Sequence, residues 1–260
     1  RDVGKEGSLI VGQLWHPGRQ QLWHPTKTPI GVSNLPDPYS GTVPHVMDTK
    51  EVYRVAEAYI NTAKRLADCG FDGVELHGAH GYLMTQFLSA ASNIRDDEFG
   101  GDTVSRTLFI RNIAQGIKEA CGKNFIVGLK MPADEGVEGG VDPNEAEQIT
   151  KLLSATNNFD YFSYGQGNFS LSLENHVPDL YFREGHFIDL HKRMRSAANG
   201  VPVMALGRIG TAQLAEDVIG NGNADLVGMS RALITDAALP KKAQLGCLLY
   251  TSPSPRDSDS

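Results

Sequence analysis

The stretch Gly70-Phe-Asp-Gly-Val-Glu-Leu-His77-Gly-Ala-His80-Gly-Tyr82-Leu-Met-Thr-Gln86-Phe-Leu is the most informative part of the chain. Its first half is a short apolar run, which is typical of a buried strand. Two histidines and a tyrosine follow immediately, and all three side chains can exchange protons or make hydrogen bonds. Because β/α proteins place their chemistry at strand ends, we expect His77, His80 and Tyr82 to belong to a functional site.

Apolar runs elsewhere in the chain predict five further strands, at residues 9–15, 125–131, 161–164, 201–206 and 224–229. They are almost continuously apolar, as is typical of parallel strands that are buried on both faces. Helical patterns lie between them. One begins at the capping box of Asp48 and Glu51, a second at Asp142-Pro143 and a third at Thr211. This order predicts an α/β fold with a parallel sheet and right-handed crossovers.

The number of strands leaves two architectures open. About six strand–helix units can be counted, which on counting alone favours a doubly wound open sheet. A closed (β/α)8 barrel needs eight units, but its single mouth suits candidate functional residues at the ends of nearly every strand. The long connections 17–47 and 88–103 also follow strand ends, and loops of this length are usually functional or disordered.

Size and composition exclude several classes of protein. The 260 residues carry a formal net charge of −7 and no basic run, which argues against a nucleic-acid partner. No apolar run reaches the roughly 18 residues that a membrane span needs. No signal peptide precedes the first expected strand, and the three cysteines are widely spaced, so a reducing, cytoplasmic location is expected. Cys69 and Cys121 are expected in the core near helix ends.

The last residues differ from the rest of the chain. Residues 247–260 are dominated by Pro, Ser, Asp and Arg and show no periodicity. They resemble translated sequencing-adapter read-through or a disordered terminus. We therefore expect one folded unit over residues 1–246 and exclude residues 247–260 from the functional argument.

Four motifs of the chain can be compared with known families. They are Gln13-Leu-Trp-His-Pro-Gly-Arg19, Phe71-Asp-Gly-Val-Glu-Leu-His-Gly-Ala-His-Gly-Tyr-Leu83, Ser92-Asn-Ile-Arg-Asp-Asp-Glu-Phe-Gly-Gly101 and Ala224-Asp-Leu-Val-Gly-Met-Ser-Arg231. Together they resemble the Old Yellow Enzyme family of FMN-dependent ene-reductases and their amine-dehydrogenase relatives. They occur in the order typical of the family, and the resemblance runs from about Leu9 to Gly246. It implies an eight-stranded (β/α)8 TIM barrel that is incomplete here, with the first two βα units missing.

The resemblance implies a phosphate site for FMN after the last two strands. Gly207, Arg208, Gly228 and Arg231 are expected there, since backbone N–H groups in Gly-rich turns and guanidinium groups bind phosphate. Ser230 stands where the family more often has Gly, and it either adds a hydrogen bond or crowds the backbone. The alternative is that the two glycines only make tight turns.

Two polar residues in apolar strands are expected at the flavin ring. Lys130 must face a polar cavity or a partner, because burying an unpaired ammonium is costly. The family usually has Arg here, beside the flavin N1 edge, and a lysine snorkelling from the strand end is the alternative. Gln13 can hydrogen-bond the flavin pyrimidine edge through its amide.

The resemblance also implies catalytic roles. His77 and His80 would bind an electron-withdrawing group of the substrate, typically a carbonyl oxygen. Tyr82 would protonate the α-carbon, since an ordinary tyrosine keeps its proton at pH 7; the alternative is a packing role. No third metal ligand occurs at a recognisable spacing, so we expect no metal. His16 and Arg19 are expected at the same mouth, and residues 95–98 are expected to form internal ion pairs.

Two further segments resemble the long multidomain branch of the family. Ser163-Tyr-Gly-Gln-Gly-Asn-Phe169 and His176-Val-Pro-Asp179 are similar to dienoyl-CoA reductases, trimethylamine dehydrogenase and N-demethylases. In that branch an iron–sulfur cluster and a dinucleotide-binding portion follow the barrel. Cys247 stands alone, so a 4Fe-4S cluster and FAD are expected only in a longer parent and not in this chain.

The main hypothesis is an FMN-dependent oxidoreductase that transfers hydride from NADH or NADPH through the flavin to an activated C=C bond. The first alternative is an FMN-dependent amine dehydrogenase or N-demethylase, and the second is a truncated, non-catalytic fragment. The expected partner is a small-molecule substrate, namely an enone, an enoyl thioester or an amine. No nucleic acid or membrane is expected, and a homo-oligomer is left open.

Overall fold

The computed structural model describes residues 2–21 and 26–246, and the expectation for residues 247–260 lies outside them. Six parallel strands form the main sheet, in the order β1-β4-β5-β6-β7-β8. Their bounds are β1 (Val11–Leu14), β4 (Gly73–His77), β5 (Ile126–Pro132), β6 (Tyr161–Gly165), β7 (Val203–Ala205) and β8 (Leu226–Val227). Each coincides with one of the six apolar runs, and β4, β5 and β6 extend one residue beyond the predicted end, so the strand predictions are confirmed.

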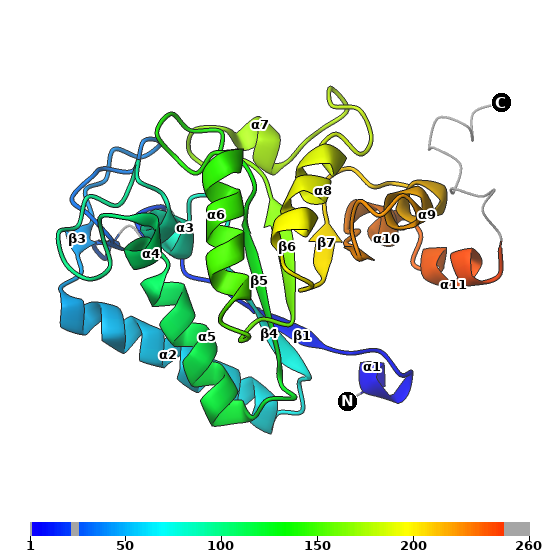
Figure 1. The fold of residues 1–260 in the computed structure, drawn as a ribbon, viewed down its shortest axis with the longest axis horizontal. Helices are drawn as coiled ribbons and strands as arrows, with labels where there is room; N and C mark the ends of the chain where they lie inside the picture. Colours follow the sequence, from blue (N-terminus) through cyan, green and yellow to red (C-terminus); the bar gives the residue numbers. More distant parts are fainter. Residues whose placement is uncertain (1, 22–25, 247–260) are drawn as a thin grey trace.

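Helices connect the strands (Figure 1). The longer ones are α2 (Thr49–Asp68), α5 (Leu108–Cys121), α6 (Pro143–Ser154), α8 (Ile188–Ala197) and α9 (Ala212–Gly220). The shorter ones are α1 (Asp2–Lys5), α3 (Leu83–Leu88), α4 (Thr103–Arg106), α7 (Leu173–His176), α10 (Arg231–Thr235) and α11 (Leu239–Gln244). A two-stranded sheet of β2 (Ile30–Gly31) and β3 (His45–Val46) lies within the connection before α2.

The helix boundaries follow from local chemistry. Helix α2 begins with a complete capping box, in which Asp48 accepts from the N–H of Glu51 and the Glu51 carboxylate accepts from the N–H of Asp48. The Asp142 carboxylate accepts from two N–H groups at the start of α6, and Pro143 occupies the first helical turn. The Thr211 hydroxyl caps α9. All three predicted helix starts are confirmed.

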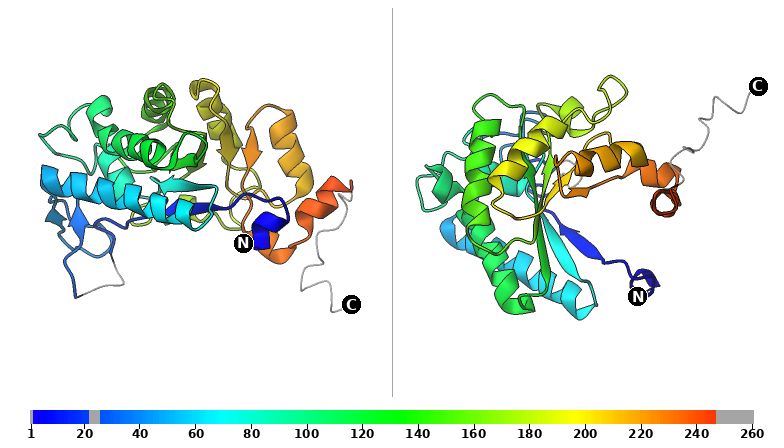
Figure 2. Two further views of the ribbon diagram at one scale, coloured as in Figure 1. Left: turned by 90° about the horizontal axis from the view of Figure 1, so that it is seen from below. Right: turned by 45° about the vertical axis from the view of Figure 1, so that its right-hand side comes forward.

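Strand order decides between the two architectures. A doubly wound sheet needs a point at which the strand order reverses. Here every strand pairs with the next main-sheet strand along the chain, so right-handed crossovers bring all connecting helices to one face. In the right-hand view of Figure 2, the cyan and green helices α2, α5 and α6 lie along one side of the strands. The arrangement is that of an incomplete (β/α)8 barrel, as the family resemblance implies.

The core lies between this sheet and its helices. Gly116 of α5 lets the helices approach closely, because a Cβ there would lie 2.3 Å from the Ile60 side chain of α2. Phe87 stacks on Phe109 with ring centroids 4.3 Å apart. The expectation of two core cysteines is wrong for Cys69, which is exposed after the end of α2, whereas Cys121 is half-buried against the core. No helix within the described residues is long and apolar enough to span a membrane.

Candidate functional site

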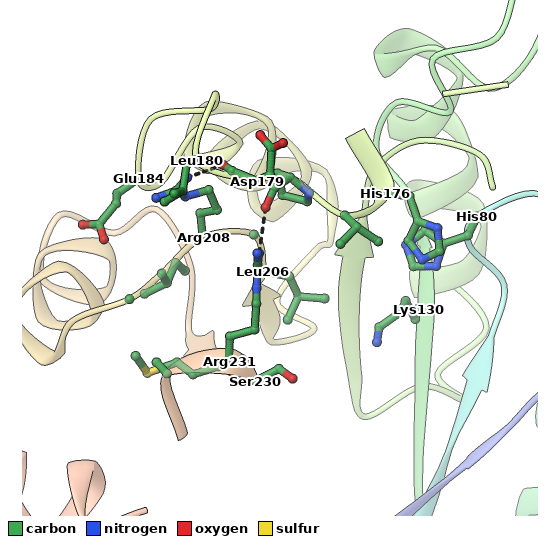
Figure 3. A pocket seen from close by; sticks show the side chains of 18 residues that line it. His80, Lys130, His176, Asp179, Leu180, Glu184, Leu206, Arg208, Ser230 and Arg231 are labelled. Atoms are coloured by element: carbon green, nitrogen blue, oxygen red, sulfur yellow. Dashed lines mark hydrogen bonds between the residues drawn. The ribbon is translucent and has the colours of Figure 1, made fainter. Parts of the chain in front are cut away.

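A large cavity of about 820 Å³ lies beyond the carboxyl ends of the strands (Figure 3). The turns after β7 and β8, the loop after β6 and the end of β5 contribute to its wall. Seven of the ten site residues expected from the sequence line it: His80, Lys130, Gly207, Arg208, Gly228, Ser230 and Arg231. One end carries Arg208 and Arg231, and the other carries Lys130 and the overlapping rings of His80 and His176.

The three expected catalytic side chains meet at one place, although only His80 lines the large cavity. The His77 ring lies edge-on to the rings of His80 and Tyr82, with centroids 5.1 Å away in both cases. His80 has a φ of +64° and Gly81 one of +79°, so the chain turns sharply after β4. This turn is constrained at Gly81, because a Cβ there would lie 2.3 Å from the Asn168 amide. It places His80 and Tyr82 beside His77.

Burial keeps this cluster uncharged. Burial, together with the nearby Lys130 ammonium, lowers the pKa of His77 to about 3. Burial and the neighbouring His176, His77 and Lys130 hold the pKa of His80 well below its usual value. Burial also raises the pKa of Tyr82, so its phenol keeps its proton at pH 7. The site therefore offers neutral imidazoles, which each donate one N–H, and a protonated phenol.

Lys130 has the buried partner that its place in an apolar strand required. Its Nζ lies 3.4 Å from Oε1 of Glu75, and their side chains are 20% and 10% exposed. Glu75 also accepts from Gln13 Nε2 at 2.6 Å, Ser163 Oγ at 2.8 Å and Tyr161 Oη at 3.1 Å. Burial alone would raise the pKa of Glu75, but the Lys130 charge and these three donors outweigh it and lower the pKa. Glu75 therefore stays ionised in the interior.

Gln13 is the expected flavin contact whose geometry differs most from the expectation. It lies on β1 directly opposite Glu75 in the register, and its residue is exposed rather than turned into the large cavity. One N–H of its amide donates to the Glu75 carboxylate, which leaves the second N–H and the carbonyl oxygen for another partner. Its contact with the flavin stays a prediction.

The arginine end is held by the loop that follows β6. Arg231 Nη2 donates to the carbonyl of Pro178 at 2.8 Å, and Arg208 Nη1 donates to the carbonyl of Asp179. Gly207 has a φ of +101°, which other residues rarely adopt. A Cβ at Gly228 would lie 2.2 Å from the Leu206 side chain. Backbone conformation thus explains why residue 207 is a glycine, and packing explains it for residue 228. Both glycines also line the cavity, as Arg208 and Arg231 do.

Residues 1–249 match the model of the NADH:flavin oxidoreductase / NADH oxidase family. The chain belongs to this family. It is 34% identical over 246 residues to an NADH oxidase of Thermoanaerobacter brockii, covering 94% of this chain and 37% of that protein. It is 33% identical to an NADPH dehydrogenase of Clostridium acetobutylicum, covering 90% of this chain and 66% of that protein.

Two solved structures resemble this member of the NADH:flavin oxidoreductase family throughout most of its length. The structure of a 2-naphthoyl-CoA reductase complex matches with a TM-score of 0.85 at 26% identity, and the match covers 94% of this chain and 39% of the reductase chain. The structure of histamine dehydrogenase from Rhizobium sp. 4-9 matches with a TM-score of 0.83 at 28% identity, and the match covers 93% of this chain and 35% of the dehydrogenase chain. The chain therefore spans between about a third and two thirds of these relatives' lengths.

Family membership implies FMN, with NADH or NADPH as the reductant, and the cavity fits this cofactor. Its volume lies within the roughly 300–1,000 Å³ of ligand sites. Arg208 and Arg231 could hold a phosphate, because guanidinium groups bind it through several N–H donors. Lys130 could sit beside the ring edge. The buried Nδ1 of His80 has no hydrogen-bond partner within the described residues.

Sequence reasoning missed two residues of the candidate site and placed others differently. Glu75 interrupts an apolar strand as Lys130 does, so the same argument would have found it. The stacking of His176 on His80 has no signal in the sequence, because it depends on the path of the loop after β6. His16 and Arg19 do not line the large cavity.

Other polar groups nearby have structural roles. Arg95 pairs with Asp97, which confirms the ion pair expected in residues 95–98. His16 accepts a hydrogen bond from the N–H of Gly18 and so shapes its own loop. No group of three His, Cys, Asp or Glu side chains within residues 2–21 and 26–246 is arranged to hold a metal ion.

Proposed function

We propose that residues 1–246 form part of an FMN-binding barrel whose parent enzyme uses NADH or NADPH to reduce an activated C=C bond. The observation that carries this is the two-ended cavity, with Arg208 and Arg231 at one end and Lys130 with His80 at the other. An FMN has a phosphate at one end and a ring system at the other. The charge pattern therefore suits it in one orientation.

A bound FMN supplies the carrier that accepts hydride from the nicotinamide and gives it to the substrate. The chain supplies the charges around it. Arg208, Arg231 and the backbone after Gly207 and Gly228 bind the phosphate in this proposal. The Lys130 ammonium, held in place by Glu75, stabilises negative charge at the ring edge.

His77, His80 and Tyr82 act on the substrate in this proposal. The neutral imidazoles donate N–H groups to a carbonyl oxygen and stabilise the enolate-like charge that develops when hydride arrives at the β-carbon. Tyr82 then transfers its phenolic proton to the α-carbon. Its position supports this role, because its ring contacts that of His77 and its raised pKa keeps the proton available.

Amine oxidation is the second candidate, and aromatic rings near the histidines favour it. Trp15 lies edge-on to Tyr82 with centroids 5.2 Å apart, and Phe169 stacks near Tyr82 at 6.5 Å. Such rings bind cationic amines, and one of the similar solved structures is a histamine dehydrogenase. Against it, the charged cavity-lining residue that acts on the pKa of both His77 and His80 is Lys130, which is positive. Reduction of a carbonyl-activated alkene is therefore supported better.

Spectroscopy of the purified chain tests the proposal. FMN added to the chain should become protein-bound, with a changed visible spectrum, and NADH or NADPH should bleach it under anaerobic conditions. Addition of 2-cyclohexenone should restore the oxidised spectrum. Bleaching by an amine without a nicotinamide would favour the second candidate. A chain that binds no FMN would be the non-catalytic fragment, and the same measurements on the full-length parent would then test the activity.

A further inference from the structure

A buried polar network joins three loops beside the turn that follows β4. Gln20 follows β1, Glu135 follows β5 and Asn168 follows β6, and these residues are 2%, 3% and 4% exposed. None of the three lines the large cavity, so the network is distinct from the groups assigned to the cofactor and the substrate. Buried polar side chains are stable only with hydrogen-bond partners, and the partners of this network meet at Asn168.

The carboxamide of Asn168 is used on both sides. Its Nδ2 donates to Oε1 of Glu135 at 2.9 Å. Its Oδ1 accepts from Nε2 of Gln20 at 3.3 Å and from the N–H of Ser170 at 2.9 Å. An aspartate has the acceptors but, when ionised, no donor, so an amide of this size is needed to make all three bonds.

Glu135 is also fixed from its other side. Its Oε2 accepts from the N–H of Val141 at 3.1 Å, and its own N–H donates to the carbonyl of Val141 at 2.8 Å. The carbonyl of Glu135 accepts from the Ser172 hydroxyl, and that hydroxyl accepts from the N–H of Asn168, at 2.8 Å in both cases. The loop after β5 is thereby bonded to the loop after β6 through side chains and backbone.

The loop after β6 in turn holds the turn after β4. The N–H of Phe169 donates to the carbonyl of His80 at 3.0 Å, and His80 and Asn168 form an isolated parallel β-bridge. A Cβ at Gly81 would lie 2.3 Å from Nδ2 of Asn168, and a Cβ at Gly165 would lie 2.5 Å from Nε2 of His80. The loop therefore contacts the turn at its backbone and at the His80 ring.

The conformation of this turn needs an external constraint. His80 has a φ of +64°, which residues other than glycine adopt rarely and which persists only where the surroundings hold it. Tyr82 follows two residues later, directly before α3, so the direction of its phenol depends on the same turn. Small displacements of a catalytic group lower the rate strongly, so whatever holds this turn affects the chemistry.

We propose that Asn168 and Glu135 are positioning residues for the reaction at His80 and Tyr82. Their hydrogen bond fixes the loop after β6 on Gly81, and this loop holds the His80 carbonyl. Both side chains act through the turn. The effect on the reaction rests on the proposed function, whereas the constraint on the turn does not and can be measured without turnover.

An exchange of charge between the two side chains tests the pair. Asn168→Asp removes the donor and places two carboxylates together. Glu135→Gln turns an NH2 group toward either Asn168 Nδ2 or the Val141 N–H, both of which are donors. In the double variant, the amide at position 135 donates to the carboxylate at position 168 and still accepts from the Val141 N–H. Both single variants should disturb the turn, and the double variant should restore it.

Nitrogen-15 NMR of the histidine rings in the full chain, without added ligand, measures the turn itself. The ring signals of His80 should shift in both single variants and return in the double variant, and those of exposed His186 should stay unchanged. Asn61→Asp, at an exposed position of α2, is the matched control and should shift neither ring. Urea unfolding establishes that each variant is folded. Glu135→Gln, in which no like charges meet, carries the comparison if Asn168→Asp does not fold.

Stopped-flow absorbance of the FMN-loaded chain measures the consequence for the reaction. Each single variant should lower the rate constant for 2-cyclohexenone reduction at saturating substrate by about tenfold or more, and the double variant should recover most of the loss. The dissociation constant of FMN should stay unchanged. Unshifted His80 signals, a double variant no better than the single ones, or a parallel loss of FMN affinity would each overturn the proposal. His80 signals that shift and return in a chain without alkene reduction would leave the constraint standing and reject the proposed function instead.

Discussion

Glu75 of β4 and Lys130 of β5 form an ion pair inside the sheet, with Nζ and Oε1 3.4 Å apart. The same carboxylate accepts hydrogen bonds from Gln13 on β1 and from Tyr161 and Ser163 on β6. One side chain therefore joins four strands and also sets the position of the cation at the cavity. Gly128 makes room for this, because a Cβ there would lie 2.1 Å from the Tyr161 ring.

Glu75→Gln should destabilise the protein. Removing one partner of a buried ion pair leaves the other charge uncompensated, which costs about 3–5 kcal/mol. Because Lys130 is partly exposed, we expect the lower part of that range from urea unfolding. Asp189→Asn serves as a control, since its pair with Arg183 lies on the surface and the two side chains are 90% and 71% exposed. Equal stability of Glu75→Gln and the wild type would show that the pair does not hold the sheet together.

Tyr82→Phe should reduce alkene reduction and spare the other steps. Loss of a general acid typically lowers the rate by about 10²–10⁴-fold. Flavin bleaching by NADH or NADPH should keep its rate, because it needs no proton from Tyr82. Stopped-flow absorbance separates the two half-reactions, and Tyr181→Phe, at a position 92% exposed, is the matched control. An unchanged alkene half-reaction would assign Tyr82 a packing role.

Arg231→Ala should weaken FMN binding but not riboflavin binding. A hydrogen bond to a charged group contributes about 1.5–3 kcal/mol, or roughly 10- to 150-fold in the dissociation constant. Riboflavin lacks the phosphate, so its affinity should stay the same. Fluorescence titration measures both, and Arg183→Ala, with a 71% exposed side chain, is the control. A parallel loss of riboflavin affinity would place Arg231 away from the phosphate.

Gly228→Ala should cost stability because there is no space for its methyl group. The new Cβ would lie 2.2 Å from Leu206 and 3.1 Å from the sulfur of Met204. Overpacking of this kind costs about 1–3 kcal/mol. Gly220→Ala, at the end of α9, has no heavy atom within 4 Å of its new Cβ and should be neutral or slightly stabilising. Thermal unfolding of both variants measures the difference in stability. Equal melting temperatures would show that the turn after β8 can move to accommodate the methyl group.

Stability should fall as the pH drops below neutral. The pKa of His77 is about 3 in the folded protein, because burial and the Lys130 charge disfavour protonation, but an unfolded histidine titrates near about 6.5. The unfolded state binds more protons between these values, so the contribution of neutral His77 is complete above about pH 6.5 and is lost toward pH 3. His77→Gln should flatten the slope of unfolding free energy by up to about 1.4 kcal/mol per pH unit. His186→Gln, at an exposed position, is the control.

Much of the fold could be predicted from the sequence because its signals are local. Six apolar runs predicted six strands, and Asp48, Asp142 and Thr211 predicted three helix starts. Strand order could not be predicted in the same way, because counting strands says nothing of which edges pair. The sequential order is what distinguishes part of a barrel from a doubly wound sheet.

Without the family resemblance, the site could be predicted only where a single residue, by its type and place, required a particular environment. Lys130 in an apolar strand required a partner or a polar cavity, and the structure gives it both. The use of Gln13 by Glu75 depends on the register between β1 and β4, which no local pattern contains. The stacking of His176 on His80 depends on the loop after β6 in the same way.

The carbonyl groups of Pro178 and Asp179 occupy N–H donors of the two arginines that would receive a phosphate. An anion arriving there must share those donors or release the loop from them. His176 precedes Pro178 by two residues and carries the ring that covers His80. The segment from His176 to Asp179 therefore connects the two ends of the cavity. An anion that displaced the carbonyl groups from the arginines would loosen this segment and with it the stacking of His176 on His80.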